Sequence, residues 1–402
     1  MVVPLRRVMA VLPFVVTRCF GLGRSGPGDV AARRPSDRSG SGAVDLSETF
    51  QKGYHPIRDL ATASGIMTTL RDVASRAGVS IGSVSAVINR TAPVSATLRL
   101  RVMAAIDELG YAPDGVARSL KTGRTRTIGL VIPDITNPLF AALAAATERA
   151  CDAAGYALVL CATADDPEKE LRALRLMRTQ RADGLILVLS GVEPGNAEAI
   201  RRLVTGPAVL VDRTLRGLAD FDSVTVDNRA AARLAVEHMI RCGHRRIGIV
   251  TGRPGISIST ERFEGYHEAL AEAGIPLDDD LAACGDFHIE TAMRATAALL
   301  QRQPRPTAIF STSNLTTIGV MRAIAEQGLN CPQDVSVAGI DDFEWSTAFS
   351  PRLTAVVQPV QAIGERAVEC LLARLAGPPP AEPVRDVFAP LLVVRDSCRE
   401  IG

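Results

Sequence analysis

The sequence predicts a small all-α domain followed by a two-lobed α/β domain, with parallel sheets flanked by helices. Two short amphipathic helical patterns meet at the turn Gly78-Val79-Ser80, which indicates the all-α domain. From Thr127 onward, short apolar runs rich in branched residues alternate with helical segments, a pattern typical of parallel strands joined by crossover helices. The chain has 402 residues, 47% of them hydrophobic and 22% charged, which is enough for a small module and two core-bearing lobes.

Residues 1–66 lack the pattern of a folded domain. Arg6-Arg7 followed by the apolar run Val8 to Val16 is similar to the start of a signal peptide, although Pro13 interrupts the run and it is too short to span a membrane. The tract from Gly21 to Gly42 is rich in Gly, Ser, Arg and Pro, which predicts disorder. We therefore expect a disordered or dispensable extension and no membrane partner.

The next segment, residues 67–112, predicts a helix-turn-helix. Thr69 is suited to cap a first helix with Asp72 three residues later, Gly78 ends that helix, and Ser80 is suited to cap a second one. The apolar positions at helical spacing are Leu70, Val73, Ala74 and Ala77 in the first helix and Val84, Val87 and Ile88 in the second. A third helix, Ser95 to Leu109, carries an apolar face made of Leu98, Val102, Ile106 and Leu109.

In a helix-turn-helix the second helix enters the major groove of DNA with its N-terminal residues at the base edges. The residues expected to contact DNA are Thr69, Ser80, Ile81, Gly82, Ser83, Ser85, Ala86, Asn89 and Arg90. The alternative is an ordinary helical hairpin inside a larger core. The charge favours DNA, because residues 67–126 contain nine Lys and Arg against four Asp and Glu, a net +5 in a chain whose net charge is +1.

Metal, redox and catalytic chemistry find little support in the sequence. The eight cysteines include no CxxC pair and the five histidines are scattered, so the thiols are interpreted as reduced groups of a cytosolic protein. No GxSxG, Walker or HExxH motif is present. We therefore expect neither an enzyme nor a bound cofactor or metal.

Residues 127–402 predict the two lobes, at about 127–227 and 245–352, with a crossover back at 353–376. Pockets in parallel sheets lie at the carboxyl ends of the strands, so the residues that follow the predicted strands are the candidates for binding a small-molecule effector. They are Asp134, Asn137, Phe140, Asp212, Arg213, Arg262, Phe287, Ser313, Asn314, Asp341 and Phe343. Asp341 and Arg262 suit hydroxyl or carboxylate groups, and Phe140, Phe287 and Trp345 suit an apolar ligand face. Structural ion pairs, helix caps and core packing are the ordinary alternatives.

Three segments carry a specific resemblance: LRDVASRAGVS, SVSAVIN, and LRVMAAIDELGYAPDGVARSLKTGRTRTIGLVIPD. In order and spacing they are similar to the N-terminal module of the LacI family of bacterial repressors, and the resemblance continues to about residue 396. It implies a cytoplasmic homodimer that binds double-stranded operator DNA, and a lobed domain similar to periplasmic binding proteins. An exported solute-binding protein of a transporter, which would use the same two lobes, is the alternative.

The resemblance also implies a hinge helix within residues 113–126, ordered when two copies pair on the operator. Leu120 would wedge into the minor groove, with Arg118 and Lys121 beside it. Gly115, a poor helix residue, favours a plain linker instead. Because the family's chains usually start near Met67, residues 1–66 are interpreted as an over-long start assignment or a dispensable tail.

The sequence departs from the family at both sites. Relatives commonly have Asn-Asp where this chain has Ser313-Asn314, and the run Ile256 to Ser259 replaces polar or charged positions, which predicts a pocket less polar than a sugar pocket. On the second helix, Ile81, Gly82 and Ala86 replace larger polar residues. Such side chains can contact a thymine methyl but cannot make bidentate hydrogen bonds to guanine or adenine. Specificity for the DNA sequence would therefore depend more on hinge insertion and on DNA shape.

Overall fold

The structure is a computed structural model that describes residues 68–89, 92–111, 123–190, 196–377 and 382–401. The chain divides into a helical unit that ends at Lys121 and a lobed unit that begins at Thr122. The predicted extension at residues 1–66, Arg90, and the hinge residues Arg118, Leu120 and Lys121 lie outside the described residues, as do the side chains of Asn89 and Trp345.

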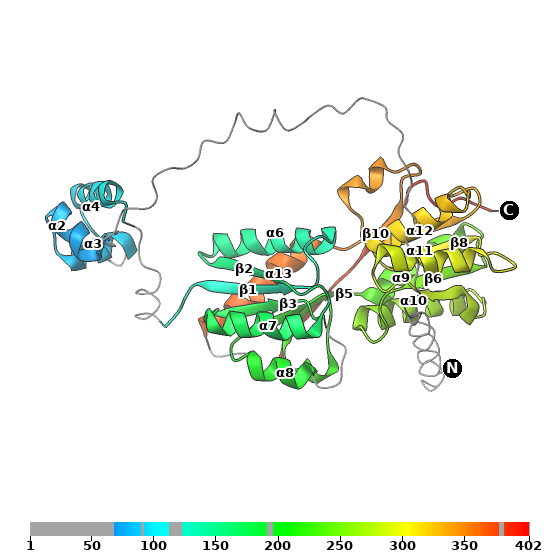
Figure 1. The fold of residues 1–402 in the computed structure, drawn as a ribbon, viewed down its shortest axis with the longest axis horizontal. Coiled ribbons are helices and arrows are strands. Elements are labelled where there is room, and N and C mark those ends of the chain that lie inside the picture. The colour runs from blue at the N-terminus through cyan, green and yellow to red at the C-terminus, as the bar shows by residue number, and fades with distance from the viewer. Residues whose placement is uncertain (1–67, 90–91, 112–122, 191–195, 378–381, 402) are drawn as a thin grey trace, which may run out of the picture. The chain divides into compact units, whose positions relative to one another are not determined.

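The described part of the helical unit contains three helices, which Figure 1 shows in blue to cyan: α2 (Leu70–Ala77), α3 (Ile81–Asn89) and α4 (Ala96–Leu109). Thr69 and Asp72 form the predicted capping box, since the Asp72 carboxylate accepts from the Thr69 amide at 2.7 Å and the Thr69 hydroxyl accepts from the Asp72 amide at 3.4 Å. Ser80 Oγ accepts from the Ser83 amide at 3.1 Å. Both predicted caps are therefore confirmed, and Gly78 ends α2 in the left-handed conformation at φ +62°.

A small apolar core holds these three helices together. Its buried members are Val73, Ala74, Ala77, Val84, Val87, Val102, Ala105 and Tyr111. Arg101 reinforces the core, because its guanidinium donates to the carbonyls of Ala77 at 2.5 Å and Gly78 at 3.1 Å, at the end of α2 where helical carbonyls lack partners. The turn between α2 and α3 is therefore fixed both by its own caps and by α4.

The first lobe is a sheet of six parallel strands in the order β11-β5-β4-β3-β1-β2. Its strands are β1 (Thr127–Ile132), β2 (Ala157–Ala162), β3 (Gly184–Leu187), β4 (Ala208–Val211), β5 (Asp222–Val226) and β11 (Arg385–Phe388). Its helices are α6 (Pro138–Ala153), α7 (Pro167–Thr179), α8 (Asn196–Leu203), α13 (Val360–Ala376) and the short 3-10 helix η1 (Arg216–Leu218). In Figure 1, α6 and α7 lie on opposite faces of this sheet, and α13 packs beside α6.

The second lobe is a sheet in the order β12-β10-β9-β8-β6-β7, parallel except for β12. Its strands are β6 (Ile247–Thr251), β7 (Ala282–Cys284), β8 (Ala308–Ser311), β9 (Ser336–Ile340), β10 (Thr354–Val357) and β12 (Leu391–Val393). Its helices are α9 (Asn228–Arg241), α10 (Ser257–Glu272), α11 (Ile289–Leu300), α12 (Asn314–Glu326), η2 (Asp279–Leu281) and η3 (Glu344–Ala348). Helices α9 and α10 pack together, as do α11 and α12, so a helix pair covers each face.

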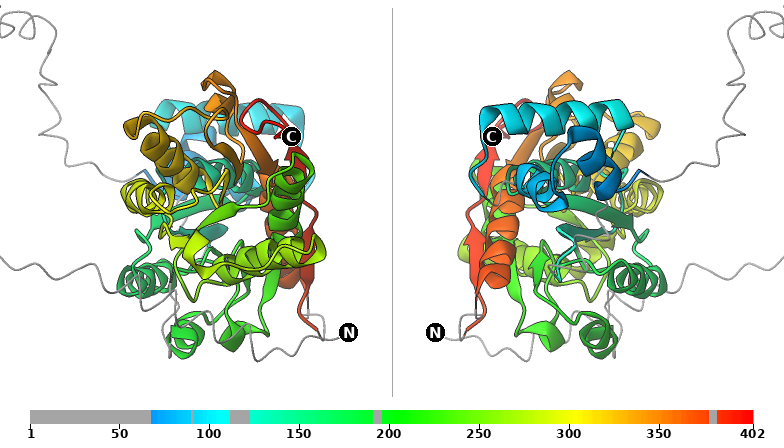
Figure 2. Two further views of the ribbon diagram at one scale, coloured as in Figure 1. Left: turned by 90° about the vertical axis from the view of Figure 1, so that its right-hand side faces the viewer. Right: turned by 90° about the vertical axis from the view of Figure 1, so that its left-hand side faces the viewer.

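The chain passes between the lobes three times, from β5 to α9, from β10 to α13 and from β11 to β12. The red C-terminal strands run along one side of the lobed unit in Figure 2, where β11 and β12 are the edge strands of their sheets. The apolar runs TIGLVIP, YALVLCA, GLILVLS, AVLVD, RIGIVTG, PTAIFST and DVSVAGI, which predict strands, occur as β1, β2, β3, β4, β6, β8 and β9, and the predicted crossover helix occurs as α13. Strands β5, β7, β10, β11 and β12 were not predicted, because they are short or lack a continuous apolar run.

Gly78→Ala should lower the free energy of unfolding of the helical unit by about 1 to 2 kcal/mol, because Gly78 has a positive φ and an added Cβ would lie 2.9 Å from Arg101. Gly82→Ala is the matched control. Gly82 lies within α3 with no atom closer than 3.7 Å to a built Cβ, so alanine should be neutral or stabilising there. Urea unfolding followed by circular dichroism measures both changes, and equal losses would contradict the assigned turn.

Candidate functional site

The outward face of α3 carries small and apolar side chains. Ile81 is 45% exposed, Ser80 and Gly82 are also exposed, and the predicted contacts Ser83, Ser85 and Ala86 are partly buried. The hydroxyls of Ser80 and Ser83 lie 2.9 Å apart at the start of the helix. The described side chains of this surface can offer hydroxyl hydrogen bonds and apolar contact with a thymine methyl, but no amide or guanidinium fork for a purine edge; the Asn89 amide at the end of α3 is not among them.

A cavity of about 190 Å³ lies between the two lobes at the carboxyl ends of their strands. Its lining residues are Asp134, Asn137, Leu139, Phe140, Ala164, Asp165, Asp212, Arg213, Ile258, Arg262, Phe287, His288, Ser313, Leu315 and Asp341. Nine of the eleven residues predicted to bind an effector are among them; Asn314 and Phe343 are not. The strand-end rule therefore located the cavity even though its members come from segments far apart in the sequence.

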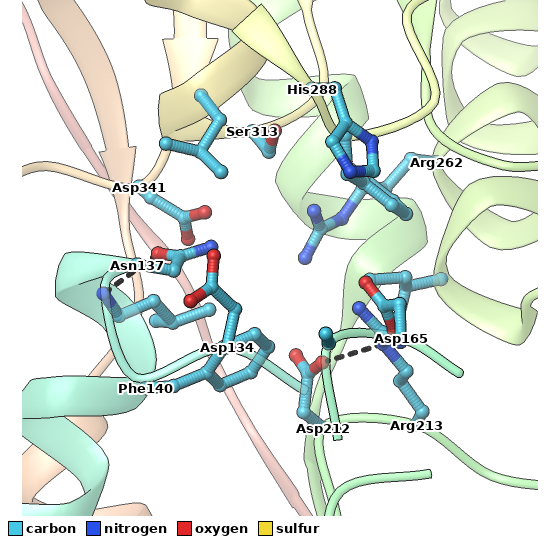
Figure 3. Close-up of a pocket in the computed structure, with 15 residues that line it drawn as sticks. Asp134, Asn137, Phe140, Asp165, Asp212, Arg213, Arg262, His288, Ser313 and Asp341 are labelled. Carbon is cyan, nitrogen blue, oxygen red and sulfur yellow. Dashed lines mark hydrogen bonds and ion pairs between the residues drawn. The ribbon is translucent and has the colours of Figure 1, made fainter. Parts of the chain in front are cut away.

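Arg262 presents a hydrogen-bond donor to the cavity. Its side chain belongs to α10 and is 1% exposed; Nε donates to Asn228 Oδ1 at 2.8 Å and Nη1 donates to the carbonyl of Thr312 at 2.6 Å. Among the described residues Nη2 has no hydrogen-bond partner. Figure 3 shows the guanidinium pointing toward the middle of the cavity. A buried donor without a partner is costly, which is the condition that a bound acceptor relieves.

Two buried carboxylates face the same space. Asp341 follows β9 and its Oδ1 accepts from Gln358 Nε2 at 2.5 Å. Asp212 follows β4, and within the described part of the chain its Oδ2 has no hydrogen-bond partner. Burial raises the pKa of both carboxyl groups, and for Asp212 the nearby Arg213 and Arg262 guanidiniums oppose that rise. Carboxylate acceptors opposite a guanidinium donor can bind the hydroxyls of one ligand in directional pairs.

Arg213, in contrast, is held by the protein. Its Nη1 donates to Asp165 at 2.6 Å and to the carbonyl of Leu189 at 3.0 Å. Its guanidinium carbon lies 5.8 Å from the ring centroid of Phe140 and 5.7 Å from that of Phe287, which come from different lobes. Arg213 therefore positions two rings of the cavity wall, and its guanidinium is ion-paired with Asp165 and, at 3.5 Å from Nε, with Asp212 Oδ2.

Backbone strain concentrates around the cavity. Non-glycine residues with positive φ follow the strands here: Ala164, Asp165, Asp212, Asp286, Phe287 and Asp341. Such conformations cost energy and persist where the surroundings fix them, often at functional sites. Gly252 is part of this arrangement, because a Cβ at Gly252 would lie 1.9 Å from the ring of Phe287. The structure thus maintains a strained wall on both sides of the cavity.

Other residues were placed differently or missed. Asn314 Nδ2 donates to Asn137 Oδ1 and so bonds protein rather than facing the cavity, while Phe343 is buried with its ring 6.4 Å from that of Phe349. Asp165 was missed although it follows β2, where the same strand-end rule applies. The other lining residues outside the prediction are Leu139, Ala164, Ile258, His288 and Leu315.

The described residues contain neither a cluster of metal ligands nor a membrane-spanning helix. In that part of the chain no group of three or more His, Cys, Asp and Glu could hold a metal ion. None of the helices described there has the length and apolar character needed to cross a membrane.

Comparison with known proteins assigns the family. Residues 69–114 match the model for bacterial regulatory proteins of the lacI family, and residues 236–398 match the periplasmic binding protein-like domain. Together with the relatives described next, these matches show that the chain belongs to the LacI family: it is a DNA-binding transcriptional regulator with a ligand-binding domain of two lobes.

Two curated relatives are similar over their whole length. The HTH-type transcriptional repressor PurR of Photobacterium profundum is 35% identical over 338 residues, covering 84% of this chain and 100% of the relative. The ribose operon repressor of Escherichia coli is 36% identical over 331 residues, covering 82% and 100%. These relatives favour the regulator over the alternative of an exported solute-binding protein.

Solved structures show the same architecture. The lac repressor dimer bound to operator and the anti-inducer ONPF has a TM-score of 0.74 at 30% identity, covering 83% of this chain and 99% of that chain. The complex of the transcriptional regulator CelR with cellobiose has a TM-score of 0.63 at 32% identity, covering 82% and 99%. The fold prediction is therefore confirmed.

Asp212→Asn should raise stability at neutral pH, because burial disfavours the Asp212 carboxylate. A carboxyl whose folded pKa is raised stabilises the fold below its ordinary pKa of 3.8, and this contribution is lost as the pH rises through the folded value. The variant should therefore match the wild type near pH 3 to 4 and exceed it increasingly toward pH 7. Urea unfolding across this range tests the effect, and a variant less stable at pH 7 would contradict it.

Proposed function

We propose that this chain is a cytoplasmic repressor that binds operator DNA as a homodimer and whose operator affinity is controlled by a small molecule bound between its lobes. The observation that carries the proposal is the cavity, where Arg262 Nη2 of one lobe and Asp212 Oδ2 of the other are buried and have no hydrogen-bond partner among the described residues, Asp212 Oδ2 being held only by an ion pair with Arg213 Nε at 3.5 Å. A ligand that satisfies both groups binds one arrangement of the lobes better than another, which is the requirement for a switch.

The charges around the cavity favour a neutral, polyhydroxylated ligand. Its described lining includes four carboxylates, on Asp134, Asp165, Asp212 and Asp341, and two guanidiniums. Because Arg213 is ion-paired with both Asp165 and Asp212, Arg262 is left to match the charge of an anionic ligand, and Asp134 and Asp341 lie in the same lining. Hydroxyl groups can accept from Arg262 and donate to Asp212, while Phe140 and Phe287 contact the apolar face of a sugar ring. The cellobiose complex and the ribose operon repressor support a sugar.

A homodimer is supported by an exposed edge of the first lobe as well as by the lac repressor dimer. Strand β2 is an edge strand of its sheet, its six residues carry no charge, and Leu160 is 36% exposed. Uncharged apolar edge strands are normally covered in native proteins. A second copy across a two-fold axis would cover this edge and would present two copies of α3 to a near-palindromic operator.

The hinge at residues 113–126 connects the two events, ligand binding and operator binding. Ligand binding changes the relative orientation of the lobes, and this change alters the spacing of the two hinge segments in the dimer. Leu120 inserts into the minor groove, while Arg118 and Lys121 contact phosphates. Contacts made by the hinge would supply specificity that α3 does not, because the described side chains of α3 offer few groups that can recognise bases.

A gel shift with the DNA upstream of the protein's own gene, at low salt, tests the proposal. Ile81→Glu should weaken operator binding at least tenfold, because it places a negative charge on the exposed face of α3. Leu100→Glu makes the same change at a side chain that is 71% exposed on α4, and binding should stay within about threefold of wild type. If the two variants lose affinity equally, α3 is not the DNA face.

Arg262→Gln should raise the ligand concentration needed for the effector response roughly tenfold or more, because it removes a buried charged donor worth about 1.5 to 3 kcal/mol, and it should leave operator affinity without ligand unchanged. Thermal shift with neutral sugars and with sugar acids should first identify a neutral sugar that raises the melting temperature of the wild type. A response only to sugar acids would contradict the proposed ligand class, and a normal response of the variant would remove Arg262 from the site.

A further inference from the structure

Two asparagines join the lobes directly. Asn314, the first residue of α12 in the second lobe, donates from Nδ2 to Oδ1 of Asn137 at 2.8 Å. Asn137 precedes α6 in the first lobe and caps that helix. Both side chains are buried, and the two residues are 177 positions apart in the sequence. The bond therefore ties the start of a helix in one lobe to the start of a helix in the other.

The orientation of each amide is fixed by a second bond. Asn137 Oδ1 also accepts from the Leu139 amide at 3.0 Å, which is the N-cap bond of α6. Asn314 Oδ1 accepts from the Leu315 amide at 2.6 Å, which leaves its Nδ2 as the group that faces Asn137. An amide at position 314 supplies the donor that this arrangement needs, and a carboxylate there has none.

Other contacts cross the cleft beside this pair. The Thr214 amide donates to Ser257 Oγ at 3.1 Å, and Arg253 Nη1 donates to the carbonyl of Asp165 at 3.2 Å. Each joins a strand-end segment of the first lobe to one of the second lobe. The Thr214 amide is a useful reporter, because its hydrogen bond exists only while the lobes are together.

We propose that Asn137 and Asn314 form a latch that sets the closure of the lobes, and that they are positioning residues for the effector site rather than its ligands. Asn137 lines the cavity, so the latch fixes part of the wall that a bound molecule contacts. A molecule bound beside Asn137 contacts the side chain that also accepts the hydrogen bond from Asn314. Binding in the cavity therefore changes the strength of the bond that holds the lobes closed. The link from closure to DNA rests on the proposed function, whereas the latch itself does not.

Two isosteric substitutions distinguish the Asn137–Asn314 hydrogen bond from the other roles of these residues. Asn314→Asp replaces the donor with a carboxylate that faces Asn137 Oδ1, so the bond is lost. Asn137→Asp keeps an acceptor for both the Leu139 amide and Asn314 Nδ2, so the cap and the latch remain. Both variants add one negative charge at the same contact, which makes the second a matched control for the first.

Amide hydrogen exchange of the full-length chain, without any ligand or DNA, measures closure. In Asn314→Asp the Thr214 amide should exchange about tenfold faster than in the wild type, the effect of losing one buried hydrogen bond of about 1.4 kcal/mol. In Asn137→Asp it should stay within about twofold. Amides within β8 (Ala308–Ser311) should be unchanged in both variants, which shows that each variant is folded. Should Asn314→Asp not fold, Asn314→Ala removes the same donor without adding a charge.

Unchanged exchange at Thr214 in a folded Asn314 variant would overturn the latch, as would equal acceleration in Asn137→Asp. Operator titration then tests the coupling: Asn314→Asp should change operator affinity at least threefold relative to the wild type, and an unchanged affinity would overturn it. If the wild-type protein binds no operator, the proposed function is wrong. The hydrogen-exchange result would still decide whether Asn137 and Asn314 hold the lobes closed.

Discussion

A parallel sheet places the carboxyl ends of its parallel strands along one edge, and both sheets of this chain turn that edge toward one cavity. The constraint explains why the lining residues follow strands or lie at the starts of helices, and why they come from both lobes. Because the chain passes between the lobes three times, the two edges stay opposed while the connecting segments leave room for hinge motion.

The cavity concentrates groups that are unfavourable for the fold. Arg262 Nη2 and Asp212 Oδ2 are buried and accept or donate no hydrogen bond among the described residues, and strained backbone surrounds them. Arg213 and Asp165 show the contrasting case, a buried pair that serves the protein by positioning two aromatic rings. The side chains that are expected to bind a ligand therefore lower the stability of the ligand-free fold. Such a trade-off between stability and binding is common at functional sites.

Much of the architecture could be predicted because its determinants are local. The caps at Thr69 and Ser80 depend on residues within three positions, and the central strands depend on continuous apolar runs. Strand β5 was missed because it begins with Asp222, whose burial depends on Arg374, 152 residues away. The contacts of Arg213 with Asp165 and of Asn314 with Asn137 could not be predicted for the same reason, because these partners are distant in sequence and meet only in the folded chain.

In the proposed mechanism, the small molecule between the lobes and the operator each bind one arrangement of the lobes better than the other, so each changes the affinity for the other. The most direct measurement is the calorimetric affinity of the neutral sugar identified by thermal shift, for the free protein and for the protein saturated with operator. The account predicts affinities that differ at least about fivefold, by the same factor that the sugar changes operator affinity, since linkage is reciprocal. Equal affinities for the free and operator-bound protein would contradict it.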